Sequence, residues 1–246
     1  MATASKATAK KRPAKTTKKA AAKAPPKKPQ LKTSPARIAK IIAGLQKAYP
    51  DATCALLHKN PWELLVATIL SAQCTDVRVN MVTPTLFRQF PTPAAMAKAS
   101  LPEIEELIRT TGFYHNKAKS ISGAAKGVVE RFGGKVPRTM DELLTLPGVA
   151  RKTGNVVLGV AYQLAEGIVV DTHVLRLSRR LELTLNTEPK KVEQDLVKII
   201  PKNHWIAFSH ELILHGRAIC IARKPRCVDC SIERECDSSD KTWSSH

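Results

Sequence analysis

Lys152 and Asp171 are the two residues whose types and settings could together do covalent chemistry. Lys152 lies in the first turn of a helix expected over Arg151 to about Leu164, directly after the tight turn Leu146 to Val149. A positive charge is unfavourable at a helix N-terminus, and Arg151 adds a like charge beside it. Both effects favour the neutral amine, which is the form that attacks an electrophile. The alternative is an ordinary solvated lysine at a helix start.

The turn before Lys152 predicts a binding site for a phosphate group. Pro147 and Gly148 break the chain between two helical segments, 139 to 145 and 151 to 164, so these segments form a short hairpin. The amides freed at the start of the second helix point outward with the positive end of its dipole, which suits a phosphate oxygen. Such a contact holds a phosphate backbone without reading its sequence. The residues expected to make it are Gly148, Ala150 and Arg151.

Asp171 follows the apolar run Ile168-Val169-Val170 and precedes a helix that begins near Val174. It is therefore expected to cap that helix. Capping does not exclude chemistry, because a carboxylate directed into a cleft could also accept or shuttle protons and complement a cationic transition state. A lysine and a carboxylate on either side of a phosphate-binding hairpin are the parts of an amine nucleophile site.

Four cysteines near the end of the chain predict a metal site. They follow the spacing C-x6-C-x2-C-x5-C within 17 residues: Cys220, Cys227, Cys230 and Cys236. No stretch is long and apolar enough to span a membrane, and the N-terminus lacks the apolar core of a signal peptide, so a reducing compartment is expected. There, clustered cysteines indicate metal binding rather than disulfides. Zinc is one alternative, although structural zinc sites usually use two short spacers and only one is present here.

The first loop of this cysteine segment carries three cations, Arg223, Lys224 and Arg226. A loop fixed at both ends by metal ligands would hold these side chains ready for phosphates; the alternative is a merely solvated loop. The remaining cysteines, Cys54 and Cys74, lie far away in sequence and are expected to be small buried residues.

The elements that position these residues all have a helical period from Pro35 onward, and no run alternates as a half-buried strand would. The chain is therefore expected to be all-α. A helix is expected from about Pro35 to Ala48, and later ones from about 189 to 200 and 205 to 219. Helix starts are signalled at Asn60-Pro61, Thr92-Pro93, Ser100 with Glu103 and Thr139 with Glu142, and stops at Gly112 and Gly133-Gly134.

The formal charge of +19 is unevenly distributed. Residues 1 to 50 contain 14 Lys or Arg and no acid, whereas the remainder has 26 basic and 21 acidic residues, a net charge of +5. A basic body with a more basic arm suggests a polyanionic partner. Residues 1 to 32 have almost nothing to bury and are expected to be a disordered arm. The arm is either a weak tether to DNA or a solubilising or targeting tail.

Five segments resemble the endonuclease III family of DNA glycosylases over roughly residues 35 to 240. They are LLVATILSAQCTDVRVN, TTGFYHNKA, LPGVARKTGNVV, VDTHVLRLSRRL and HGRAICIARKPRCVDCSIERECD. Three departures from the family pattern are visible. Ala150 stands where a second hairpin glycine is common, Gly154 stands where alanine is usual, and the connection between Lys152 and Asp171 is one residue longer than expected.

The resemblance implies a bifunctional DNA glycosylase and AP lyase of base excision repair, monomeric and acting on oxidised pyrimidines in double-stranded DNA. The amine of Lys152 would displace the damaged base, and elimination from the Schiff base would cut the strand 3′ to the abasic site, with Asp171 as its catalytic partner. A 4Fe-4S cluster held by the four cysteines is implied as well. The setting would be the cytoplasm of a bacterium, near the nucleoid, or a eukaryotic nucleus.

The resemblance also implies that Gln73 and Phe113 enter the duplex and fill the gap left by a flipped base. Pattern alone favours another interpretation, in which Gln73 caps a helix and Phe113 packs in the core. His173 would contact a phosphate or act as a structural hydrogen-bonding residue.

The implied fold is two-lobed. A six-helix lobe would span 54 to 164, with the helix-hairpin-helix at about 139 to 164. A cluster lobe would combine 33 to 53 with 165 to 236, and 237 to 246 would form a tail. DNA would lie in the groove between the lobes.

Two other classes of protein share some of these features. Adenine-specific mismatch glycosylases use the aspartate but lack the lysine and carry an extra C-terminal domain; Lys152, and a chain that ends ten residues after Cys236, argue against this class. A non-catalytic DNA-binding module held by zinc is the second. Visible absorbance and strand cutting at an abasic site would separate the three.

Overall fold

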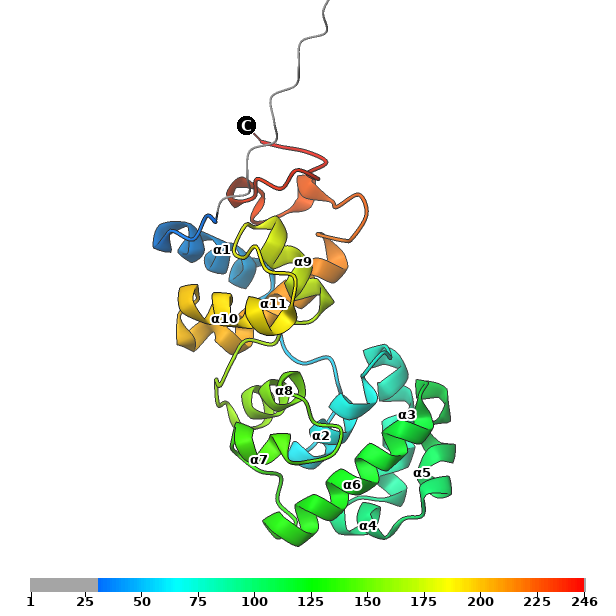
Figure 1. The fold of residues 1–246 in the computed structure, drawn as a ribbon. Helices are drawn as coiled ribbons and strands as arrows, with labels where there is room; N and C mark the ends of the chain where they lie inside the picture. Colours follow the sequence, from blue (N-terminus) through cyan, green and yellow to red (C-terminus); the bar gives the residue numbers. More distant parts are fainter. Residues whose placement is uncertain (1–30, 246) are drawn as a thin grey trace, which may run out of the picture.

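The computed structural model describes residues 31–245, and every regular element in that range is helical (Figure 1). The all-α prediction is confirmed. The α-helices are α1 (Pro35–Ala48), α2 (Pro61–Leu70), α3 (Asp76–Gln89), α4 (Pro93–Lys98), α5 (Leu101–Ile108), α6 (Tyr114–Phe132), α7 (Met140–Leu144), α8 (Arg151–Tyr162), α9 (Thr172–Arg180), α10 (Pro189–Ile199) and α11 (Trp205–Ala218). The 3₁₀ turns are η1 (Arg109–Thr111), η2 (Lys202–His204), η3 (Cys227–Asp229) and η4 (Glu233–Glu235).

Local capping explains where several helices begin. Asn60 caps α2 by accepting a hydrogen bond from the Glu63 amide at 2.9 Å, and Ser100 with Glu103 forms a capping box at α5. Thr139 caps α7 in the same way. These starts agree with the sequence signals.

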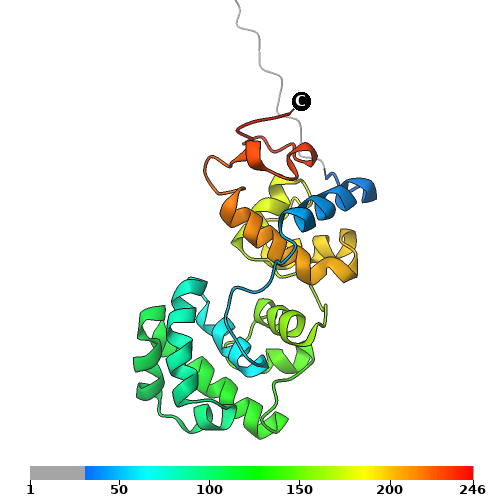
Figure 2. The ribbon, with the colours of Figure 1, turned by 180° about the vertical axis from the view of Figure 1, so that it is seen from behind.

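The helices pack around two hydrophobic cores, which Figures 1 and 2 show from opposite sides as two groups. The first core is built from α2 to α8 and includes Leu64, Leu65 and Ile121. In the second core, α1 packs on α11 although the two helices are far apart in sequence. No helix in residues 31–245 is long and apolar enough to cross a membrane. The expected domain boundaries stay a prediction.

The segment before Asp171 runs between the two cores. Ile168 and Val170 are buried in the second core, and Val169, between them, is buried in the first. Alternate side chains of an extended segment point to opposite sides. The Val169 amide also donates to Ser209 Oγ at 3.0 Å. The segment that leads to Asp171 is therefore held by contacts with both cores, and it fixes the position of Asp171.

The basic arm falls almost wholly outside the described residues. Lys32, at its expected end, is held in place: its amide donates to the Glu182 carbonyl at 3.0 Å, and its ammonium pairs with Glu182 and Asp237. These contacts join Lys32 to the helical body.

Candidate active site

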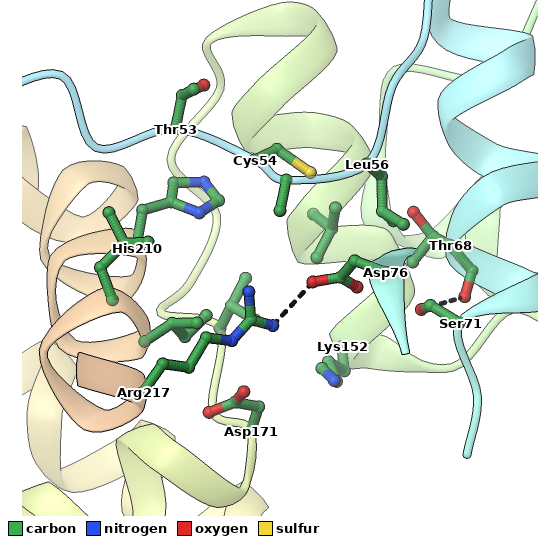
Figure 3. Close-up of a pocket in the computed structure, with 15 residues that line it drawn as sticks. Thr53, Cys54, Leu56, Thr68, Ser71, Asp76, Lys152, Asp171, His210 and Arg217 are labelled. Carbon is green, nitrogen blue, oxygen red and sulfur yellow. Dashed lines mark hydrogen bonds and ion pairs between the residues drawn. The ribbon is translucent and has the colours of Figure 1, made fainter. Parts of the chain in front are cut away.

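Lys152 and Asp171 line the same pocket (Figure 3). The pocket lies where α2, α8, α11 and the start of α3 meet the chain segments before α2 and α9. An ion pair between Arg217 Nη2 and Asp76 Oδ2, 2.6 Å apart, crosses one side of it. The other lining residues are Thr53, Cys54, Ala55, Leu56, Thr68, Ser71, Val156, Val169, His210, Ile213 and Leu214. The fold therefore brings the two predicted catalytic residues together.

Lys152 is exposed in the first turn of α8 and makes no ion pair or hydrogen bond within residues 31–245. The N-cap residue, Ala150, provides no side-chain cap, so the first-turn amides are available to a ligand. Arg151 repels a positive charge on Lys152 less than the sequence suggests. Its guanidinium is paired with Glu193 of α10, Nε lying 3.0 Å from Oε2, so part of its charge is neutralised.

Gly148 is required by the geometry of the hairpin turn. Its φ is +75°, a conformation that other residues rarely adopt. A Cβ at this position would lie 2.6 Å from the Ser120 Cβ. The turn therefore packs tightly against α6, and only glycine fits there.

Asp171 caps α9, as predicted. Its Oδ1 accepts hydrogen bonds from the amides of His173 and Val174, both at 2.8 Å. Its Oδ2 makes no hydrogen bond within the described chain. One carboxylate oxygen thus fixes the side chain, and the other remains available for chemistry.

Gln73 and Phe113 both occupy the left-handed region of backbone space, with φ of 51° and 50°. Phe113 is 64% exposed, so the core-packing interpretation is wrong. Gln73 is also exposed. The C-cap of α2 is Ser71 and the N-cap of α3 is Thr75, so the capping interpretation of Gln73 is wrong too. Non-glycine residues held in this conformation are strained, and such strain is concentrated at functional sites.

His173, in the first turn of α9, packs against α11. Its Nδ1 is 3.2 Å from Arg176 Nη2, and its side chain packs against Gly216. It also lines a second pocket together with Gln73 and Arg217. The structure therefore gives His173 a structural hydrogen bond and leaves it beside the predicted interface.

Sequence reasoning did not single out Asp76, Arg217 or His210 as residues of the site. Asp76 and Arg217 are far apart in sequence, and only packing of α11 against the start of α3 joins them. Burial lowers the pKa of His210, which favours the neutral ring. Asp76 belongs to the segment SAQCTD, and His210 and Arg217 belong to HELILHGR. Neither segment indicates by itself that Asp76 and Arg217 form an ion pair.

The four cysteines of the metal prediction lie within electrostatic reach of one another. Burial, and then the charges of Cys220, Cys236 and Cys227, raises the pKa of the Cys230 thiol to about 12. Within residues 31–245, no group of three or more His, Cys, Asp or Glu side chains is arranged to hold a metal ion by itself.

Three of the cysteine sulfurs have nitrogen neighbours. Arg180 Nη1 donates to Cys220 Sγ at 3.2 Å, and the Thr242 amide donates to Cys227 Sγ at 3.5 Å. His215 Nε2 lies 3.3 Å from Cys230 Sγ.

The residues after Cys236 fold back over the cysteine segment. Lys241 Nζ pairs with Glu233 at 2.5 Å and donates to the Cys236 carbonyl at 2.8 Å. Thr242 Oγ1 donates to the Pro225 carbonyl at 2.5 Å. The expected tail is therefore in contact with the helical body.

The cationic loop of the cysteine segment is exposed at Arg223, Lys224 and Arg226. Arg226 pairs with Asp229 at 2.7 Å, whereas Arg223 and Lys224 have no ion-pair partner in the described part of the chain. Two cations of this loop are therefore free for a polyanion.

The family model for HhH-GPD superfamily base excision DNA repair proteins matches residues 66–202, more than half of the chain. The endonuclease III of Synechocystis sp. is 56% identical over 203 residues, which cover 82% of this chain and 93% of that protein. The chain belongs to the endonuclease III family. The predicted resemblance is confirmed.

Solved structures of endonuclease III agree in fold. A non-covalent endonuclease III–DNA complex matches with a TM-score of 0.78 and 42% identity, over 83% of this chain and 95% of that one. A trapped endonuclease III–DNA covalent intermediate matches with a TM-score of 0.78 and 43% identity, over 83% and 96%.

The departures from the endonuclease III pattern have local explanations. Ala150 has a φ of −98°, which alanine adopts without strain. At Gly154 an added Cβ would lie 2.5 Å from Met140 Sδ, so Met140 fills the space that an alanine methyl would need. In the connection between Lys152 and Asp171, α8 ends where Gln163 takes a φ of 55° and the Leu164 amide donates to the Leu158 carbonyl at 2.9 Å.

Proposed function

We propose that this protein is a bifunctional DNA glycosylase and AP lyase of base excision repair that removes oxidised pyrimidines from double-stranded DNA. The observation that carries the proposal is the pocket shared by Lys152 and Asp171, next to a hairpin with free amides. Schiff-base chemistry on a sugar of DNA requires an exposed amine, a carboxylate and groups that bind the neighbouring phosphates. A related structure described as a trapped covalent intermediate with DNA supports the same chemistry.

DNA binding would begin with phosphates. The backbone at Gly148 and Ala150, and the exposed Arg223 and Lys224, would hold the duplex without reading its sequence. Phe113, exposed on a strained turn, would replace the stacking lost when a nucleotide rotates out. Gln73, which is exposed as well, would fill the gap left by the flipped base.

The reaction would then proceed on the flipped nucleotide. The Lys152 nitrogen bonds to the anomeric carbon, the glycosidic bond breaks, and the base leaves with a proton. The sugar ring opens to give a Schiff base, which makes the neighbouring C2′ proton acidic. Loss of that proton expels the 3′ phosphate and cuts the strand. Asp171 Oδ2 would accept and pass on protons and would stabilise the positive charge that develops on the sugar.

A 4Fe-4S cluster is the group that fits the four cysteines best. Each cysteine binds a different iron in such a cluster, so the sulfurs need not converge on one ion, as they must in a zinc site. The hydrogen bonds that Arg180 and the Thr242 amide donate to the sulfurs of Cys220 and Cys227 suit thiolates, and the Arg180 charge offsets part of the thiolate charge. When bound, the cluster would serve as a structural cross-link that holds the cationic loop in place.

Cys227→Ser is expected to lose iron and to lower the folding yield before it affects the chemistry itself, because metal binding supplies folding free energy in such segments. Iron content and visible absorbance of the purified variant would measure this. Cys54→Ser is the matched control, since Cys54 lines the pocket and is not one of the four clustered cysteines, and it should keep full iron. Fully active Cys227→Ser protein containing zinc and no iron would contradict the assignment.

The remaining parts of the protein fit the same role. We infer that the 54–164 lobe and the 33–53 plus 165–236 lobe close on DNA from two sides. The arm, which lies outside the described residues, would tether the enzyme weakly through its 10 basic residues in positions 1–30. Such a charge would favour association with the nucleoid.

The proposal is tested by mixing the wild-type protein with a duplex that contains one oxidised pyrimidine, in the presence of borohydride. A covalent protein–DNA adduct is expected, and without borohydride the strand should be cut 3′ to the lesion. A duplex with an adenine mismatch is the matched control and should remain intact. Excision of adenine without adduct or cutting would favour the mismatch glycosylase alternative.

A further inference from the structure

Glu193 of α10 is a buried carboxylate that contacts the start of α8, the helix that carries Lys152. Its side chain is 9% exposed. It accepts hydrogen bonds from Arg151 Nε at 3.0 and 3.1 Å and from Asn155 Nδ2 at 2.9 Å. Arg151 directly precedes Lys152 in sequence, and Asn155 lies about one turn further along α8.

These hydrogen bonds join the two cores. Residues of α8 such as Val157 belong to the first core, whereas Val192 and Leu196 of α10 belong to the second. The position of Lys152 relative to the second core therefore depends on the Glu193 carboxylate.

The same carboxylate touches the segment that leads to Asp171. A Cβ added at Gly167 would overlap Oε1 of Glu193 and would lie 2.7 Å from Asn155 Nδ2. The backbone at Gly167 thus packs directly on the hydrogen-bonded group. Asp171 follows four residues later. Glu193 contacts both the helix that carries Lys152 and the segment that carries Asp171.

Stability alone is a poor explanation for this arrangement. The Arg151 side chain is 45% exposed, so its ion pair with Glu193 is partly screened by solvent and contributes little to stability. Asn155 Oδ1 is in addition buried without a hydrogen-bond partner in the described residues, which is unfavourable. We therefore expect the buried polar groups of Glu193 and Asn155 to fix the positions of the residues around them.

We propose that Glu193 is a positioning residue for the glycosylase and lyase reaction. It sets the distance between the Lys152 amine and the Asp171 carboxylate by holding Arg151, Asn155 and the Gly167 backbone in one arrangement. This inference rests on the proposed function. Glu193 does not touch the reacting atoms and acts through its neighbours.

Glu193→Gln keeps the shape of the side chain but places an NH₂ group against donors. The single-turnover rate constant for base excision is expected to fall roughly 10- to 100-fold, because small misplacements of reacting groups have effects of this size. Affinity for the lesion duplex should stay equal or increase, since Arg151 gains freedom to contact phosphate. Glu188→Gln is the matched control, an exposed glutamate at the start of α10 whose ion pair is with Lys191, and it should match wild type.

Gly167→Ala tests the same contact from the other side, since the added methyl displaces the carboxylate without removing its charge. It should also slow excision. Glu193→Asp shortens the side chain and makes room for that methyl. The double variant Gly167→Ala with Glu193→Asp should therefore be faster than the product of the two single effects predicts.

Borohydride trapping separates positioning from a merely structural role. Misfolding would lower the fraction of protein that can be trapped but leave the single-turnover rate constant of the remainder unchanged. If Glu193→Gln and Gly167→Ala lower only the trapped fraction, with rate constants within about twofold of wild type, the positioning role is wrong. A wild-type protein that cannot be trapped would instead overturn the proposed function, and with it the reaction that Glu193 serves.

Discussion

Lys152→Gln is expected to abolish both borohydride trapping and strand cutting. The substitution removes the amine that would bond to the sugar, and no other group in the described pocket is a primary amine. The hairpin amides and the exposed cations of the cysteine segment remain, so the lesion duplex should still bind. Gel-based detection of the adduct, with duplex binding measured in parallel, would show this separation of binding from chemistry.

Lys198→Gln is a suitable control, because it removes the same charge from an exposed site on α10 away from the pocket. It should trap at the wild-type rate. A trapped adduct in Lys152→Gln protein would mean that another amine is the nucleophile and that the central assignment is wrong.

Asp171→Asn should slow base excision by roughly 10² to 10⁴, the range found when a general acid–base group or a preorganised charge is removed. Asparagine keeps the shape and an acceptor oxygen, so the hydrogen bonds to the His173 and Val174 amides persist and α9 stays capped. Single-turnover kinetics would measure the loss, and thermal unfolding should show little change.

Asp171→Ala separates the two roles of the side chain. It should lose the same chemistry and, in addition, about 1 kcal/mol of stability through loss of the cap. Asp141→Asn, at an exposed carboxylate in the first turn of α7, is the control and should leave the rate unchanged. If Asp171→Asn excises at nearly the wild-type rate, Asp171 is only a helix cap.

Much of this protein is predictable from short-range patterns. Helix starts at Asn60, Ser100 and Thr139 depend on a side chain and an amide three residues apart, so the sequence alone indicates them. The cap role of Asp171 has the same local origin. The spacing of the four cysteines is also a short-range pattern, and the metal group that it indicates stays a prediction.

Only the tertiary structure determined which distant groups meet. Arg151 meets Glu193 across 42 positions and Arg217 meets Asp76 across 141, and no local pattern records such pairings. They arise because α8, α10 and α11 pack around two cores, which places charges from separate helices at one site. The exposure of Phe113 was also set by packing. The sequence pattern favoured a core position for this apolar residue, and only the left-handed turn after Gly112 places its side chain in solvent.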